Sequence, residues 1–373
     1  MKSVGDFHPR VGSNPTSSAI KMKKIILIAL ILLPKITLSS TDYPLIFPSK
    51  NVILGAKSNK DSFFLDSGIS FSFWSKKLSI KQITFDRTSY ITTPKIINYV
   101  YKGISQQTSD TAKISVKDFD VYLDAEYYFS DSILANFGFF LRSRDFNQVS
   151  GFGFGDMILN IIFRPISENI SDVYLSIGAV VPLAGEPDEN LATFRRINQS
   201  SFALDIPLYL MMKFSTPIQI LTSGAYIFRM SYPFFGQLIS PGDIITGNLG
   251  IYSNIRDFFP TSDISHNFSF GVFSSYIHGF PERQKTSLYS VWGKSWDVIK
   301  AGITLAGTFK KKQDIFGEKV IREWMRLSLD FSFCIFERSF ISSEYLDYAI
   351  IRFPYLDRIK PGFYSSIGLT IIF

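Results

Sequence analysis

The 373-residue sequence contains a single cysteine, three histidines and no long apolar run. One cysteine, Cys334, excludes an intramolecular disulfide and the paired thiolates of the usual zinc sites. The longest apolar run, residues 25–33, is far shorter than the about 18 or more residues that read as a membrane-spanning helix. The sequence therefore argues against helical membrane spans, and it predicts no cofactor and no bound metal.

Aromatic residues are abundant instead. Hydrophobic residues make up 46% of the chain and aromatic residues 16%, with 37 Phe and 18 Tyr. An apolar chain without long apolar runs must interleave its apolar residues with polar ones, as strands with one face in lipid require. The formal net charge of +7 comes from Lys and Arg residues that are scattered along the chain. Because they form no basic stripe, we expect no nucleic-acid partner.

The N-terminal region has the three parts of a secretory signal peptide. Lys23 and Lys24 precede the apolar run, and Pro34 and small residues up to Ser40 follow it. The run is too short to remain as an anchor, so we expect cleavage after about Ser39 or Ser40. The chain is predicted to divide into a spurious N-terminal extension at 1–21, the signal peptide at 22–40, a periplasmic segment at 41–60 and an outer-membrane barrel at 61–373.

From about residue 60 onward, segments of roughly ten residues alternate between apolar and polar positions. The clearest is 324–335, in which the apolar residues from Met325 to Ile335 share one parity and Arg326 and Asp330 share the other. Period two places the two sets on opposite faces of a strand. Strands of soluble sandwiches usually have about five or six residues, whereas tilted membrane strands need about nine to eleven, so length favours a membrane barrel.

The predicted fold class is therefore all-β, a transmembrane antiparallel β-barrel in the outer membrane of a Gram-negative bacterium. Parity and turn residues mark fifteen candidate segments, among them 86–101, 286–294 and 339–352. Bacterial single-chain barrels have even strand counts, so at least one segment is surplus. We expect about 14 strands, within a range of about 12 to 16.

Charged residues of both signs fall on the parity that faces the lumen. Buried unpaired charge is expensive, so one hypothesis is that these residues pair across strands. The other is that they form a mixed-charge constriction that selects solutes. The lumen-lining candidates are Asp118, Asp120, Asp124, Glu126, Asp205, Arg229, Lys300, Arg326 and Asp330.

The C-terminal residues alternate up to a terminal phenylalanine. This pattern resembles the signature by which the outer-membrane assembly machinery recognises barrel substrates. The expected partners are therefore that machinery, through the C-terminal Phe, together with outer-membrane lipid. The residues of this predicted assembly signal are Phe363, Ile367, Leu369, Ile371 and Phe373.

Residues 119–187 resemble the family named for the meta-pathway of phenol degradation, whose members are transporter-like outer-membrane barrels. The likeness lies in a Gly-rich entry, a Gly-Asp pair, an amphipathic strand ending in a basic residue, and an apolar strand closed by a Pro-containing turn. The resemblance implies uptake of small, often apolar or aromatic compounds. The residues that carry it are Gly153, Gly155, Asp156, Arg164 and Pro182.

Three functions compete for this sequence. The favoured one is a channel or transporter for a small-molecule solute. A surface structural or adhesive barrel without transport is the alternative, served by aromatic links at 232–235 and around Phe258 and Phe259. An outer-membrane lipid hydrolase would need His266 or His278 as a general base facing a groove. Parity places both histidines at the membrane rims, so the sequence predicts no enzyme and no catalytic residue.

Overall fold

The computed structural model describes residues 47–53, 61–79, 111–146, 149–168, 170–183, 204–215, 218–234, 237–254, 267–281, 283–285, 290–292, 295–315, 318–338 and 362–373. All of them belong to one compact unit, Leu38–Phe373. The predicted extension at 1–21 and the signal peptide at 22–40 lie outside the described residues. Within the described part of the chain, no helix is long and apolar enough to cross a bilayer.

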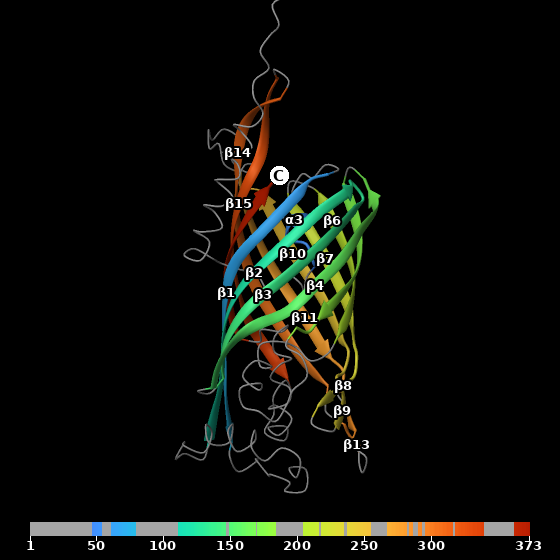
Figure 1. Ribbon diagram of the computed structural model, residues 1–373, viewed down its shortest axis with the longest axis vertical. Helices are drawn as coiled ribbons and strands as arrows, with labels where there is room; N and C mark the ends of the chain where they lie inside the picture. The colour runs from blue at the N-terminus through green and yellow to red at the C-terminus, as the bar shows by residue number, and fades with distance from the viewer. Residues whose placement is uncertain are drawn as a thin grey trace, which may run out of the picture. The chain divides into compact units, whose positions relative to one another are not determined.

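The alternating segments form long strands that close into an antiparallel barrel (Figure 1). Among the described residues, twelve strands make up the wall, in the order β1-β16-β15-β14-β11-β10-β7-β6-β5-β4-β3-β2. Their bounds are β1 Phe63–Ser79, β2 Thr111–Ser130, β3 Ile133–Phe146, β4 Val149–Ser167, β5 Ser171–Val181, β6 Asp205–Ser215, β7 Ile218–Arg229, β10 Ile244–Asn254, β11 Asn267–Gly279, β14 Trp296–Ile315, β15 Glu318–Arg338 and β16 Phe363–Ile372. The predicted fold class is confirmed, with twelve barrel strands in place of about 14.

For one predicted segment, 286–294, the difference in strand number has a structural cause. Four short strands, β8 (Tyr232–Phe234), β9 (Gln237–Ser240), β12 (Arg283–Lys285) and β13 (Ser290–Trp292), pair with one another in a separate small sheet. Alternation at 286–294 therefore marks a strand outside the barrel wall, because period two does not reveal which neighbour a strand pairs with. The predicted segments 86–101 and 339–352 lie outside the described residues.

The two ends of the barrel differ in their links. Only two or three residues join β2 to β3, β4 to β5 and β6 to β7, at one end of the barrel, the short-turn end, where Phe373 also lies. The opposite end carries most of the longer links, including the small sheet, which Figure 1 shows at the bottom of the view. The link of 12 residues between β10 and β11 lies at the short-turn end.

The last strand closes the barrel against the first. β16 pairs with β1 over ten residues, from Phe64↔Ile372 to Phe73↔Phe363. Beyond this ladder, the backbone N–H of Phe373 donates to the carbonyl of Phe63 at 2.9 Å. Closure leaves no unpaired strand edge in the wall, as a sheet in hydrocarbon requires. The strand predicted as an assembly signal is thus one side of the closing seam; recognition by the assembly machinery stays a prediction.

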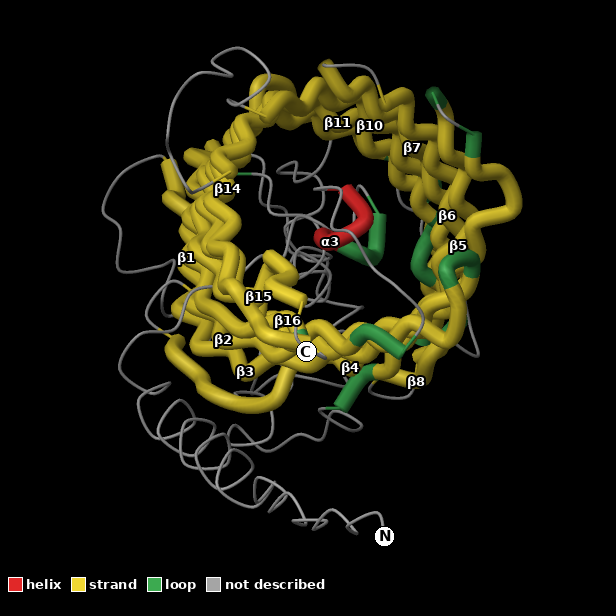
Figure 2. Tube along the Cα trace, turned by 90° about the horizontal axis from the view of Figure 1, so that it is seen from above, coloured by secondary structure: helices red, strands yellow, loops and turns green. Residues whose placement is uncertain are grey.

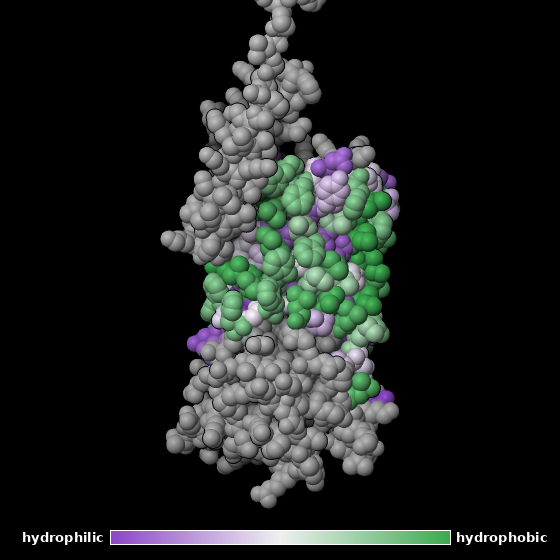
Figure 3. All heavy atoms as spheres, in the orientation of Figure 1, coloured by the Kyte–Doolittle hydropathy of each residue, from purple (hydrophilic) through white to green (hydrophobic). Residues whose placement is uncertain are grey.

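The wall is apolar outside and polar inside. Large apolar side chains such as Phe137, Leu208 and Phe270 are exposed on the outer face. The face of the barrel drawn in Figure 3 carries a broad hydrophobic surface. The residues between them on the same strands, such as Asn136 and Tyr209, are buried in the interior. A closed wall of this kind is the physical solution for a β-sheet that crosses a lipid bilayer.

Candidate functional site

A short helix lies inside the barrel. Helix α3 (Lys50–Ile53) is seen within the ring of strands in the view along the barrel (Figure 2). All of the described residues from 47 to 53 are buried, including the polar Ser49, Lys50 and Asn51. Residues 47–53, named the plug below, occupy the lumen. The predicted division of the chain that assigns 41–60 to a periplasmic segment stays a prediction.

The plug is bound to one side of the lumen by charged and polar contacts. Lys50 Nζ donates to Asp330 Oδ2 at 2.8 Å and to Ser328 Oγ at 2.5 Å, both on β15. The side-chain amide of Asn51 donates to Asp66 Oδ2 on β1 at 3.0 Å. Its oxygen accepts from Arg326 at 3.2 Å. Since β15, β16, β1 and β2 are consecutive in the wall, these contacts define one surface, named the acidic wall below.

Another part of the lumen contacts the plug mainly through aromatic rings. Phe47, which is fully buried, packs edge-on against Tyr174 of β5 and Tyr209 of β6, with both ring-centroid distances at 6.0 Å. The ammonium of Lys213, also on β6, donates to the carbonyl of Val52 at 3.2 Å. We name this surface the aromatic wall. The plug therefore joins two parts of the barrel and fills space between them.

Some buried charges are fixed within the wall itself. Arg142 of β3 makes two hydrogen bonds to Asp120 of β2, at 2.6 and 3.0 Å, and both side chains are fully buried. The Arg142 guanidinium also lies over the Phe140 ring at 4.6 Å. Between β6 and β7, Arg229 Nε lies 3.4 Å from Asp205 Oδ2. These pairs join neighbouring strands, as the pairing hypothesis expects.

The nine predicted lumen candidates lie on the inner side of the wall. Eight are buried, with exposed fractions of 8% or less, and Asp124 is half-buried. Asp205 and Arg229 form an ion pair, Glu126 lies within electrostatic range of Asp124 and Arg326, and Lys300 lies under the Tyr364 ring at 5.6 Å. The eight buried candidates are Asp118, Asp120, Glu126, Asp205, Arg229, Lys300, Arg326 and Asp330.

Sequence reasoning did not single out several residues at the site. Asp66 and Arg142 follow the inward parity of β1 and β3, so a stricter use of the alternation could have found them. The plug residues Lys50 and Asn51 lie in a segment without alternation, and nothing local marks them. Their partners on β15 are 275 to 280 positions away in sequence.

The family-like hairpin motif lies at two irregularities of β4. The β3–β4 register shifts between Phe139 and Leu141, opposite Gly155 and Asp156, which are both buried. A Cβ on Gly155 would lie 1.8 Å from the Phe140 ring, so any side chain there would force the ring to move. Gly153 pairs with Arg142 across this hairpin.

A second shift sits next to Arg164, whose guanidinium donates to Asp172 at 2.7 and 3.0 Å. Pro182 directly follows the end of β5. The motif residues therefore occupy two bulges and a strand end, which is a structural arrangement.

His278 lies on the outward side of β11 at the long-link end. Its Nδ1 is 2.8 Å from Asp297 Oδ1, which also accepts from Tyr276 at 2.6 Å. Arg338 donates to the other carboxylate oxygen at 2.7 Å. His266 lies outside the described residues. Among the described residues, no group of three or more His, Cys, Asp and Glu side chains is arranged to hold a metal ion.

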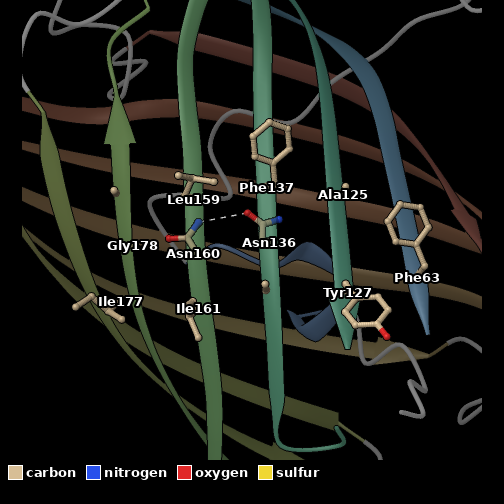
Figure 4. Close-up of a pocket in the computed structure, with 12 residues that line it drawn as sticks. Phe63, Ala125, Tyr127, Asn136, Phe137, Leu159, Asn160, Ile161, Ile177 and Gly178 are labelled. Atoms are coloured by element: carbon tan, nitrogen blue, oxygen red, sulfur yellow. Dashed lines mark hydrogen bonds between the residues drawn. The ribbon is translucent and has the colours of Figure 1, made fainter. Parts of the chain in front are cut away.

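The outer face carries an apolar depression of about 570 Å³ over β1 to β5 (Figure 4). Small residues Ala125, Ala135 and Gly178 leave the space, and aromatic and aliphatic side chains surround it. Behind it, Asn160 donates to Asn136 at 3.3 Å. An apolar depression on a lipid-facing wall suits an acyl chain of the bilayer, so we assign it no solute.

A closed antiparallel wall with an apolar exterior and a charged, occupied lumen defines a transmembrane β-barrel of the outer-membrane type. In three dimensions the chain is similar to an outer-membrane channel from Pseudomonas putida F1, with a TM-score of 0.50 and 9% sequence identity over 85% of this chain and 97% of that chain. An iron transporter from Neisseria meningitidis matches at a TM-score of 0.24 and 9% identity, over 84% of this chain and 53% of that one. The second match, at a TM-score of 0.24, is too distant to support any inference about this chain.

In sequence, no family model matches the chain. No curated protein matches it either. The structural likeness therefore shows the fold alone.

Proposed function

We propose that the protein is an outer-membrane channel or transporter for small molecules, closed by the plug in the state described above. The observation that carries the proposal is the lumen itself. A polar lumen filled by a separate segment of the chain is an arrangement that suits a channel with a movable closure. Here the occupant is held by side-chain contacts to the wall, which water or a solute could replace if the plug moved.

The orientation follows from the links. Periplasmic turns of bacterial barrels are short and external loops are longer, so the short-turn end faces the periplasm. The contacts of the plug to Asp66 and Glu126 fall in the halves of β1 and β2 nearer that end. The plug therefore enters from the periplasmic side, and its displacement would open a path through the barrel.

The resemblance to the phenol-degradation family suggests small apolar or aromatic solutes. The aromatic wall is compatible with this, because Tyr174 and Tyr209 already accept the ring of Phe47. Edge-to-face ring contacts of this kind favour aromatic ligands.

Planar-bilayer recordings test the proposal. The full chain is compared with a variant in which residues 47–53 are replaced by a Gly-Ser segment of equal length. We expect discrete conductance steps that are larger and more frequent in the variant. Heat-modifiable migration in electrophoresis controls for folding. A folded variant without conductance would sink the proposal and favour the structural alternative, for which the small sheet at the long-link end is the natural contact surface.

A further inference from the structure

We propose that the acidic wall contains a binding niche for a primary amine, and that the lumen takes small solutes that combine an ammonium group with an aromatic ring. In the closed state Lys50 and Phe47 of the plug occupy the places of these two groups. The inference rests on the proposed function and names the class of solute.

The niche is built around a glycine row of the wall. Gly68 of β1 and Gly368 of β16 are register partners, so neither strand projects a side chain into the lumen there. A Cβ on Gly368 would lie 3.5 Å from Lys50 Nζ and 3.0 Å from both Ser328 Oγ and Tyr122 Oη. The ammonium therefore sits in a space that the missing side chains provide, bordered by two hydroxyl groups and the Asp330 carboxylate.

The charge around the niche favours a cation. Asp66 and Asp124 are direct register partners on β1 and β2, and like charges placed opposite each other are destabilising. Asp124 lies within electrostatic range of Asp66, Glu126 and Lys50. The carboxylates of Asp66, Asp124 and Glu126 therefore lie within electrostatic range of one another, near the Lys50 ammonium and the Arg326 guanidinium. A bound cation relieves their repulsion, and Lys50 supplies it in the closed state.

Glu126 has an oxygen that the plug leaves unused. This side chain is 1% exposed, and one of its oxygens, Oε2, has no hydrogen-bond partner among the described residues. Its carboxylate interacts with the plug side chains of Ser49 and Asn51. Glu126 pairs with Phe64, six positions along β1 from Ser70 in the row of Asp330, so it adds negative charge to this wall and lies outside the niche.

The chemistry selects an amine over a metal ion. No metal-holding group exists among the described residues, and the hydroxyls of Ser328 and Tyr122 suit the three directed donors of an ammonium. The aromatic half of the solute follows from Phe47, which lies three positions before Lys50. The ring of Phe47 contacts Tyr174 and Tyr209.

Calorimetric titration of the plug-replaced full chain in detergent tests this directly. The probes are phenethylammonium, 2-phenylethanol and phenylacetate, which share a ring and differ in charge. We expect phenethylammonium to bind about tenfold or more tightly than the alcohol, and phenylacetate to bind most weakly. Asp330→Asn and Gly368→Val should each weaken binding of the amine by about tenfold or more, the first through charge and the second by filling the niche.

Asp145→Asn is the matched control, because Asp145 pairs with Lys117 at 3.9 Å where both side chains are about half exposed; binding should be unchanged. Equal affinity for amine and alcohol, or amine binding that survives both niche variants, would overturn the inference. Binding is measured separately from conductance, so the two proposals can fail independently. Amine binding to a barrel that does not conduct would refute the channel and support the niche. A barrel that conducts but shows no preference for the amine would support the channel and refute the niche.

Discussion

Two buried ion pairs in the lumen have the same chemistry and different positions in the fold. Asp120–Arg142 has a shortest N–O distance of 2.6 Å, and Lys50–Asp330 has one of 2.8 Å. The first joins adjacent wall strands 22 residues apart in sequence, and the second joins the plug to β15 across 280 residues. The first pair separates only when the barrel unfolds. On the proposed function the second separates whenever the plug leaves, so we expect the first pair to stabilise the wall and the second to govern opening.

Arg142→Met should have the largest effect. It leaves the Asp120 carboxylate buried without its guanidinium, which lowers the free energy of unfolding by about 3–5 kcal/mol. Denaturant unfolding of the barrel in lipid vesicles measures this. Adding Asp120→Asn should recover part of the loss, because the uncompensated charge is then gone. Unchanged stability of the single variant would contradict the assignment of this pair to the wall.

Lys50→Met should leave unfolding unchanged and favour opening. A hydrogen bond to a charged group contributes about 1.5–3 kcal/mol, so the open fraction in planar bilayers should rise by about tenfold or more. Lys117→Met is the matched control, because its partner Asp145 lies at 3.9 Å and both side chains are about half exposed. If both variants opened equally, the plug pair would have no special role.

Phe47→Leu tests the aromatic wall with a smaller change. Leucine keeps the apolar bulk and removes two edge-to-face contacts, so the plug should lose about 1–2 kcal/mol and opening should increase less than in Lys50→Met. Phe129→Leu removes a ring contact with Tyr127 on the outer face and should leave the conductance as in the unmodified chain. If Phe47→Leu raised the open fraction more than Lys50→Met does, the aromatic wall and not the acidic wall would make the larger contribution to holding the plug.

Arg338→Gln should have the smallest effect. Arg338 pairs with Asp297 at the rim, but its side chain is 63% exposed, and exposed ion pairs contribute about 0–1 kcal/mol. Neither the unfolding transition nor the open fraction should move beyond that range. A large change in opening would mean that the rim cluster around His278 is coupled to the plug.

The sequence by itself determined the barrel and the side of the wall on which each charge lies. Alternation is a local property: in 324–335 every second residue must face lipid, which fixes Arg326 and Asp330 toward the interior before any partner is known. The same reasoning extends to Asp66 and Arg142, which lie at inward positions of their strands.

Only the tertiary structure decided which strands belong to the wall, which charges meet, and what fills the lumen. The segment at 290–292 alternates yet pairs with β12 outside the barrel, because period two carries no information about neighbours. The partner of Lys50 is Asp330, 280 positions away in sequence, and the plug has no alternating pattern from which its position in the lumen could be predicted. Contacts between distant segments depend on the register and closure of the whole wall, and these are set only when the twelve described strands of the wall are paired.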